Sequence, residues 1–217
     1  MISLRPLRQL AGAFALAAVG ATSLQAQVVW TDWTSTGANA VYGSMAIGSG
    51  VNVSYTGPFS FAQLGCGTDY WTPNTYTGPG VPNAPPACDI IELDAGGLKT
   101  ITFSQAVLNP YISLVSWNGQ PSVTFNGPVS VIANGCGYWG CGAMSASGNT
   151  ITTNGGEVHG TIQLAGSYTQ ITFTDNSENW HGLTVGAAAV VTPEPSTYVL
   201  MATGMIGVFG IARRRRA

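Results

Sequence analysis

Gln170-Ile171-Thr172-Phe173-Thr174 alternates polar and apolar side chains, and so does Ser122-Val123-Thr124-Phe125-Asn126. A period of two is typical of a β-strand with one buried face. Similar short runs, separated by Gly, Asn and Pro clusters, fill residues 27–191. The predicted strands cover residues 28–33, 41–47, 51–55, 90–93, 99–103, 106–117, 122–125, 129–133, 150–153, 158–164, 168–174 and 182–191. This pattern predicts an all-β fold, an antiparallel β-sandwich of the jelly-roll type.

The central region, residues 27–191, has the length of one domain and an unusual charge. Lys99 is its single basic residue, against eight acids, which leaves a formal charge of −7. Binding to nucleic acid depends on neutralising phosphates with Lys and Arg. We therefore expect no nucleic-acid partner.

A segment of different composition precedes this region. Arg5 and Arg8 precede an apolar run at residues 10–19 and a small-residue segment that ends at Ala26. This layout is typical of a secretory signal peptide over residues 1–26, cleaved after Ala26 or after Ser23. A buried N-terminal helix is the alternative.

Four cysteines lie in the exported part, and an oxidising compartment favours disulfides. We predict the pairs Cys66–Cys88 and Cys136–Cys141, because each pair brackets a loop rich in Gly or Pro. A four-cysteine zinc site is the alternative, but the spacings lack paired C-x-x-C motifs.

The C-terminal segment has three parts in order. Pro193-Glu194-Pro195 comes first, an uncharged apolar stretch at residues 198–212 follows, and Arg213, Arg214, Arg215 and Arg216 complete it. As a helix, the apolar stretch would be about 22 Å long. By the positive-inside rule, the four arginines would keep the C-terminal end of this helix in the cytoplasm and place the central region outside the cell. A single transmembrane helix at residues 198–212 is therefore predicted.

This layout over residues 192–217 resembles the PEP-CTERM sorting signal. The resemblance implies processing near Pro193-Glu194-Pro195 by an exosortase, a membrane-embedded enzyme, and release from the inner membrane to the cell surface or extracellular matrix. Family members often occur in genomes that also make exopolysaccharide, which suggests exopolysaccharide as a partner. A plain tail anchor is the alternative.

Four further segments resemble short sequence motifs seen in other PEP-CTERM ectodomains. They are Ser116-Trp117-Asn118-Gly119, Gly135-Cys136-Gly137-Tyr138-Trp139-Gly140-Cys141-Gly142, Gly156-Glu157-Val158-His159-Gly160-Thr161-Ile162-Gln163 and Glu178-Asn179-Trp180-His181-Gly182. This resemblance implies no assigned activity.

Two histidines are the main candidates for chemistry. His159 follows Glu157, and His181 follows Asp175 and Glu178. If their strands were neighbours, the two imidazoles would form a divalent-metal site; otherwise they are hydrogen-bonded turn residues. No serine lies in a Gly-x-Ser-x-Gly motif. We expect no metal, no cofactor and no catalytic residue.

Three clustered acids leave another alternative open. Asp89, Glu92 and Asp94 could supply a glycosidase-like carboxylate pair or bind calcium, although the regular calcium-loop spacing is missing. On a strand, Glu92 and Asp94 would share one face.

Aromatic side chains in predicted loops are the better indication of binding. They are Tyr70, Trp71, Tyr76, Tyr138, Trp139 and Trp180. Sugar rings rest on aromatic planes, so Tyr138, Trp139, Glu157, His159, Trp180 and His181 are candidate ligand-binding residues. Packing over the core is the alternative reading of these rings. The sequence thus predicts an exported, non-enzymatic surface or matrix protein, with a carbohydrate-binding module or a secreted hydrolase as alternatives.

Overall fold

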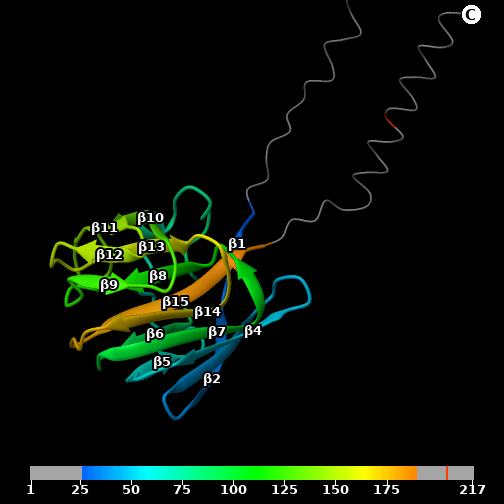
Figure 1. The fold of residues 1–217 in the computed structure, drawn as a ribbon, viewed down its shortest axis with the longest axis horizontal. Helices are drawn as coiled ribbons and strands as arrows, with labels where there is room; N and C mark the ends of the chain where they lie inside the picture. Colours follow the sequence, from blue (N-terminus) through cyan, green and yellow to red (C-terminus); the bar gives the residue numbers. More distant parts are fainter. Residues whose placement is uncertain (1–25, 190–203, 205–217) are drawn as a thin grey trace, which may run out of the picture.

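The computed structural model describes residues 26–189 and residue 204. This part of the chain is all-β, and every strand pair in it is antiparallel, which confirms the predicted class. Its layers form a sandwich (Figure 1). The jelly-roll type of connection stays a prediction.

One layer is a seven-stranded sheet with the order β10-β13-β8-β15-β6-β5, in which β1 also pairs with β15. Its strands are β1 (Val28–Trp30), β5 (Phe61–Gln63), β6 (Ile90–Leu93), β8 (Tyr111–Val115), β10 (Val129–Gly135), β13 (His159–Leu164) and β15 (His181–Ala188). The central strands β6, β8 and β15 are buried on both faces. Such strands show continuous apolar runs rather than alternation.

The opposite layer is a five-stranded sheet with the order β14-β7-β4-β3-β2. Its strands are β2 (Asp32–Gly37), β3 (Ala40–Met45), β4 (Val51–Thr56), β7 (Gly97–Leu108) and β14 (Ser167–Asp175). A three-stranded sheet, β11-β12-β9, consists of β9 (Ser122–Thr124), β11 (Met144–Ser147) and β12 (Thr150–Thr153). Side chains from all three sheets meet in one core, for example Phe103, Leu114 and Ile151.

The segment between β5 and β6 covers the outer face of the seven-stranded sheet. It contains the short helix α1 (Pro73–Tyr76), and it buries Trp71, Tyr76 and Val81. Trp71 and Tyr76 pack with Ile90 and Val115, so for these two rings the alternative of core packing is correct. Tyr70 and Trp180 are partly buried and pack against the same group.

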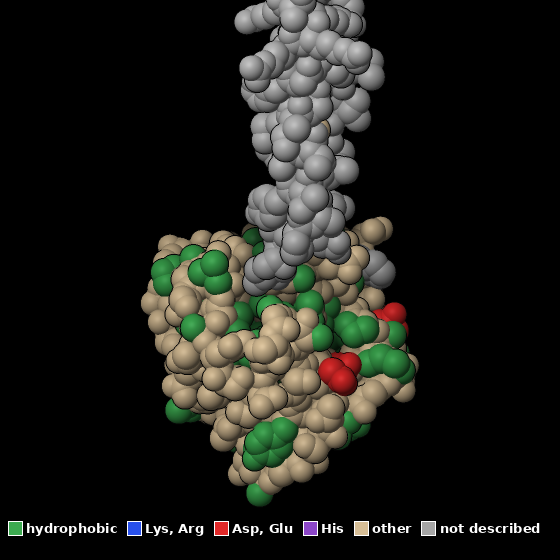
Figure 2. All heavy atoms as spheres, turned by 90° about the vertical axis from the view of Figure 1, so that its right-hand side faces the viewer, with side chains coloured by type: hydrophobic (Ala, Val, Ile, Leu, Met, Phe, Trp, Pro, Cys, Tyr) green, Lys and Arg blue, Asp and Glu red, His purple; other side chains and the backbone are tan. Residues whose placement is uncertain are grey.

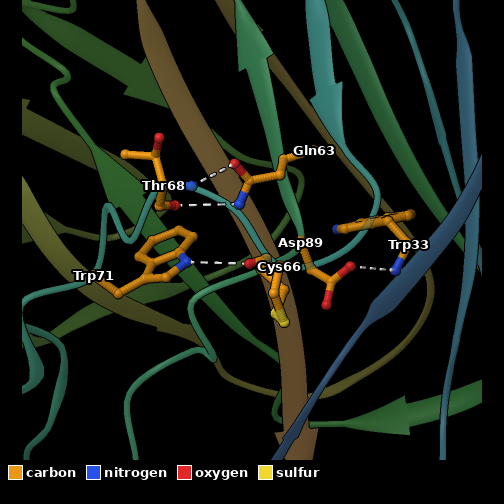
Figure 3. Close-up of a disulfide and its surroundings, with 7 residues drawn as sticks. Trp33, Gln63, Cys66, Thr68, Trp71 and Asp89 are labelled. Carbon is orange, nitrogen blue, oxygen red and sulfur yellow. Dashed lines mark hydrogen bonds between the residues drawn. A yellow bond between two sulfur atoms is a disulfide. The ribbon is translucent and has the colours of Figure 1, made fainter.

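Both predicted disulfides are present, Cys66–Cys88 and Cys136–Cys141. The first closes the covering segment (Figure 3). Beside it, Gln63 and Thr68 exchange two hydrogen bonds, and the Trp71 indole N–H donates to the Cys88 carbonyl oxygen at 3.4 Å. A zinc site at these cysteines is thereby overturned, because no cysteine of the described residues is free.

Two predicted strands are each divided in the structure. Residues 28–33 separate into β1 and β2, which belong to different sheets. Residues 106–117 separate into the end of β7 and β8, because Pro110 has no N–H for the ladder and Asn109 adopts a positive φ of 48°. Strands β5 and β11 and helix α1 were not predicted.

Asn126 protects the free edge of β14. Its backbone N–H donates to the Thr172 carbonyl oxygen at 3.0 Å, and its side-chain amide donates to the Gln170 carbonyl oxygen at 3.0 Å. The Thr172 N–H in turn donates to the Asn126 Oδ1 atom at 3.1 Å. One residue therefore satisfies edge groups that would otherwise be open to another chain.

Several predictions fall outside the described residues. They are the signal peptide apart from Ala26, the sorting residues Pro193, Glu194, Pro195 and Arg213 to Arg216, and the transmembrane helix apart from Gly204. Within the described residues, no helix has the length and apolar character to cross a membrane.

Candidate functional site

Four aromatic rings gather at one end of the sandwich: Tyr70, Tyr138, Trp139 and Trp180, called here the aromatic cluster. Tyr70 comes from the covering segment, and Tyr138 and Trp139 come from the loop that Cys136–Cys141 closes. The Trp139 and Trp180 centroids are 4.4 Å apart, and Tyr70 stacks on Trp139 at 5.6 Å. Tyr138 is 50% exposed and Trp139 is 45% exposed, so the cluster is accessible.

The two tryptophans are not coplanar. The planes of Trp139 and Trp180 are inclined at 62°, so they cannot form the flat platform that we expected for a carbohydrate-binding module. The reason is that Tyr70 also packs on Trp180, with ring centroids 5.1 Å apart, and so fixes the angle between the two tryptophans. The rings together form a wall on one side of the site. A ligand therefore meets two inclined rings rather than one plane.

A pocket of about 570 Å³ lies beside this wall. Trp139 and Trp180 line it together with the polar and acidic side chains of Ser116, Asn118, Glu157, Ser177, Glu178 and Asn179, and with Gly119. Of these residues, all except Ser177 lie in the four segments singled out in the sequence. These segments, far apart in the chain, therefore meet at one pocket.

Glu157 is fixed in this pocket by the turn that follows β8. The Ser116 hydroxyl donates to the Glu157 Oε2 atom, and the Asn118 amide donates to the Oε1 atom at 2.5 Å. Ser116 has a positive φ of 59°, which is uncommon for a residue with a side chain. Close packing also restrains the Glu157 backbone, because a Cβ atom at Gly142 would lie 2.7 Å from it.

Glu178 is the second acid of the pocket and is more deeply placed. Its side chain is 6% exposed, and its Oε2 atom accepts hydrogen bonds from the Gly119 N–H and the Gln120 side chain, each at 3.0 Å. Burial raises the pKa of the Glu178 carboxyl, and the hydrogen bond from Gln120 opposes that increase. The pocket thus combines a half-buried and a buried carboxyl group.

Behind Glu178 lies a buried group of charged side chains. The His181 Nε2 atom is 2.9 Å from the Asp175 Oδ2 atom, and its Nδ1 atom is 3.6 Å from the Glu178 Oε2 atom. Lys99 Nζ is 3.3 Å from Asp175 Oδ1. Lys99, Asp175 and His181 have no exposed side-chain surface, so His181 lies beneath the pocket and not in its wall.

The two histidines are not brought together. Strand β8 lies between β13, which carries His159, and β15, which carries His181. His159 Nδ1 is 3.2 Å from the Tyr76 hydroxyl in the covering segment, whereas His181 faces Asp175 of the opposite sheet. Burial lowers the pKa of His159.

This arrangement bears on the metal-site and hydrolase hypotheses. In the part of the chain that the structure describes, no group of three or more His, Cys, Asp or Glu side chains could hold a metal ion. Across the same residues, neither His159 nor His181 has a hydrogen bond to a serine or cysteine. The premise of a shared two-histidine site, neighbouring strands, was wrong.

The acids between residues 89 and 94 are also separated. Asp89 is buried and accepts a hydrogen bond from the Trp33 N–H at 3.1 Å (Figure 3). Burial raises its pKa to about 6. Burial likewise raises the pKa of Glu92, whereas Asp94 is exposed and lines a shallower depression with Ser177, Glu178 and Asn179. The expected shared face of Glu92 and Asp94 is not observed, because β6 ends at Leu93.

Sequence reasoning named Tyr138, Trp139, Glu157 and Trp180, and the structure brings these four to the same end of the sandwich. It missed Asn118, Glu178 and Asn179 as pocket residues, although all three lie in segments already singled out. Figure 2 shows the opposite end of the sandwich, where the charged side chains visible among the described residues are acidic.

Comparison with known proteins identifies the C-terminal segment. Residues 191–216 match the family described as PEP-CTERM protein-sorting motif. No curated protein and no solved structure matches the chain. The chain therefore carries a PEP-CTERM sorting motif, which marks it as an exported protein and is consistent with an exosortase substrate.

Proposed function

We propose that this protein is an exosortase-processed component of the cell surface or extracellular matrix, and that its pocket binds a carbohydrate without catalysis. The observation that carries the proposal is the pocket in which the Trp139 and Trp180 rings stand beside Asn118, Asn179 and Glu157. An apolar wall with a few convergent polar groups is the usual design of a small-ligand site.

The inclined rings favour a particular kind of carbohydrate. A flat polysaccharide surface needs several coplanar rings, whereas Trp139 and Trp180 are 62° apart. A pocket of about 570 Å³ accommodates a short stretch or an end of a glycan chain. The ligand is therefore a soluble oligosaccharide or a chain end.

Charge restricts the sugar further. Glu157 and Glu178 line the pocket, Asp94 lies in the adjoining depression, and Lys99 is buried and paired. These acidic side chains repel the negative charge of a uronate or a sulfate, and none of the residues that line the pocket is a cation. A neutral glycan is the best match.

Binding is tested by affinity electrophoresis of the purified mature protein in gels that contain a neutral glucan or alginate. We expect retardation by the neutral glucan, and at least a tenfold weaker affinity for Trp139→Ala, because an aromatic anchor contributes about 2 kcal/mol. Tyr42→Ala is the matched control, since Tyr42 is 48% exposed on β3 and does not line the pocket. Equal retardation of wild type and Trp139→Ala would contradict the proposal.

Processing is tested separately by intact mass of the protein from culture medium and from washed membranes of its native host. We expect a secreted species that starts near Gln27 and stops between Pro193 and Pro195. A protein that keeps residues 198–217 and stays with the membranes would overturn the exosortase part of the proposal.

Hydrolysis is the second candidate, because Glu178, with its raised pKa, shares the pocket with Glu157. A neutral acid and an ionised carboxylate are the groups that glycosidases use. We rank binding first, since the Glu178 Oε2 atom accepts hydrogen bonds from Gly119 and Gln120, and the Glu178 Oε1 atom is buried. Release of reducing ends from neutral oligosaccharides, lost in Glu157→Gln, would reverse this ranking.

A further inference from the structure

Lys99 and Asp175 occupy positions where the strand pattern calls for apolar side chains. On β7, Lys99 shares the buried face of the strand with Ile101 and Phe103. On β14, Asp175 continues the buried series that includes Phe173. Lys99 is directly opposite Phe173 in the ladder, so Lys99 and Asp175 are diagonal neighbours on one face.

Both side chains are fully buried, and their contact is unusual. Lys99 Nζ is 3.3 Å from Asp175 Oδ1, yet among the described residues Oδ1 has no hydrogen-bond partner. The Nζ atom instead donates to the Ala95 carbonyl oxygen at 2.6 Å. The amine is therefore held beside the carboxyl group in a geometry that does not form a hydrogen bond to it.

Aromatic rings and a histidine enclose the pair. Trp117 packs against Phe173 with centroids 5.9 Å apart, and against His181 with centroids 5.2 Å apart. The His181 Nε2 atom is 2.9 Å from the Asp175 Oδ2 atom, the second oxygen of the carboxyl group. The two oxygens of one carboxyl group thus face an amine and an imidazole.

We propose that Lys99 and Asp175 condense into an intramolecular isopeptide bond that joins β7 to β14. The Lys99 Nζ atom forms a bond to Asp175 Cγ, and the bond from Cγ to Oδ2 breaks. The ammonium supplies both hydrogens of the water that leaves, the carboxylate supplies its oxygen, and the amide nitrogen keeps one hydrogen. No oxidant, reductant or co-reactant is needed.

His181 is placed to carry the protons of this step. Its Nε2 atom lies at the departing oxygen, where it delivers a proton, and the proton released by Nζ restores it. Glu178 stands behind the imidazole at 3.6 Å from Nδ1. Burial keeps this carboxyl group protonated to a higher pH than usual, through its raised pKa, so it is a nearby proton source.

Burial also supplies a driving force. Two charges in an apolar core carry a large desolvation cost, whereas a neutral amide between the same atoms does not. The paired strands hold the Lys99 Nζ atom 3.3 Å from the Asp175 Oδ1 atom, which replaces a bimolecular encounter. Gly57 leaves room for the lysine, because a Cβ atom there would lie 2.9 Å from Lys99 Cδ.

The sequence provides a direct test. Lys99 is the single trypsin site between residues 27 and 191. The protein as secreted by its host is reduced, unfolded in urea and treated with trypsin. We expect no cleavage after Lys99, since an acylated lysine is not cut, and an intact mass lower than that of the disulfide-bonded sequence by one water.

Two variants make the result decisive. Leu108→Lys introduces a site at an exposed position on the same strand and must be cut, which proves access of the protease. Asp175→Ala removes the carboxyl group, so it must be cut after Lys99 and must not lose water, whether or not it folds. Cleavage of the wild type after Lys99, or a mass without the loss of water, would overturn the proposal and leave a buried ion pair.

Discussion

Removal of the Cys66–Cys88 disulfide by Cys66→Ser together with Cys88→Ser is expected to destabilise the fold by about 3 kcal/mol. The two residues are 22 apart in sequence, and the loop-entropy relation assigns that amount to a closure of this length. The second disulfide, between Cys136 and Cys141, is the matched control. Its partners are 5 apart, so its removal is expected to cost about 2 kcal/mol.

The free energy of unfolding is measured from urea denaturation, followed by tryptophan fluorescence, for the wild type and both double variants. Trp71, Tyr76 and Val81 remain apolar and can still cover the sheet, so the first variant should fold. It should also bind glycan more weakly, because Tyr70 of the loosened segment supports Trp139. Equal losses for the two variants, or a larger loss for the short loop, would refute the argument from loop length.

Other substitutions test other features. Because the folded-state pKa of Asp89 is about 6, above its ordinary value of 3.8, the contribution of Asp89 to stability should be largest below about pH 4 and be lost as the pH rises to about 6; Asp89→Asn should flatten this part of a urea-midpoint profile by on the order of 2 kcal/mol. If the pH profile of Asp89→Asn has the same curvature as that of the wild type, Asp89 is not its source. Asn126→Ala should cost about 1 to 2 kcal/mol and promote association through β14, measured by light scattering against the wild type; a monomeric, equally stable variant would contradict the edge-protecting role. Gly160→Ala should destabilise the fold by more than about 3 kcal/mol, since its Cβ atom would lie 2.1 Å from the Ala133 carbonyl oxygen and the φ of Gly160 is 157°. If the variant has the soluble yield and the urea midpoint of the wild type, the clash is disproved.

The strand pattern alone predicted the class of the fold, because alternation survives wherever one face is buried. The same pattern was less informative in the seven-stranded sheet, because the covering segment buries the second face of this sheet as well. All residues of β8, for example, are buried, so its sequence does not alternate. The break at Asn109 and Pro110 was readable from the proline, and joining residues 106–117 across it was an error.

The candidate site was predictable in part for a similar reason. Trp139 and Glu157 stood out by type and by their neighbours in the sequence, but their approach depends on a turn with Ser116 at positive φ, which no local pattern indicates. The depth of His181 was also hidden. A histidine between Trp180 and Gly182, after the polar residues 174–179, looks accessible in the sequence, but here it begins a central strand of the seven-stranded sheet and is fully buried.

The pairing of β1 with β15 has a consequence for maturation. Val28 is opposite Ala188, so the first and last strands of the described domain lie side by side (Figure 1). Trp180 precedes the other end of β15, about 26 Å away for a strand of eight residues. Cuts at the two ends of the polypeptide therefore remove nothing from the pocket, and the precursor and the trimmed protein should bind the same ligand with the same affinity.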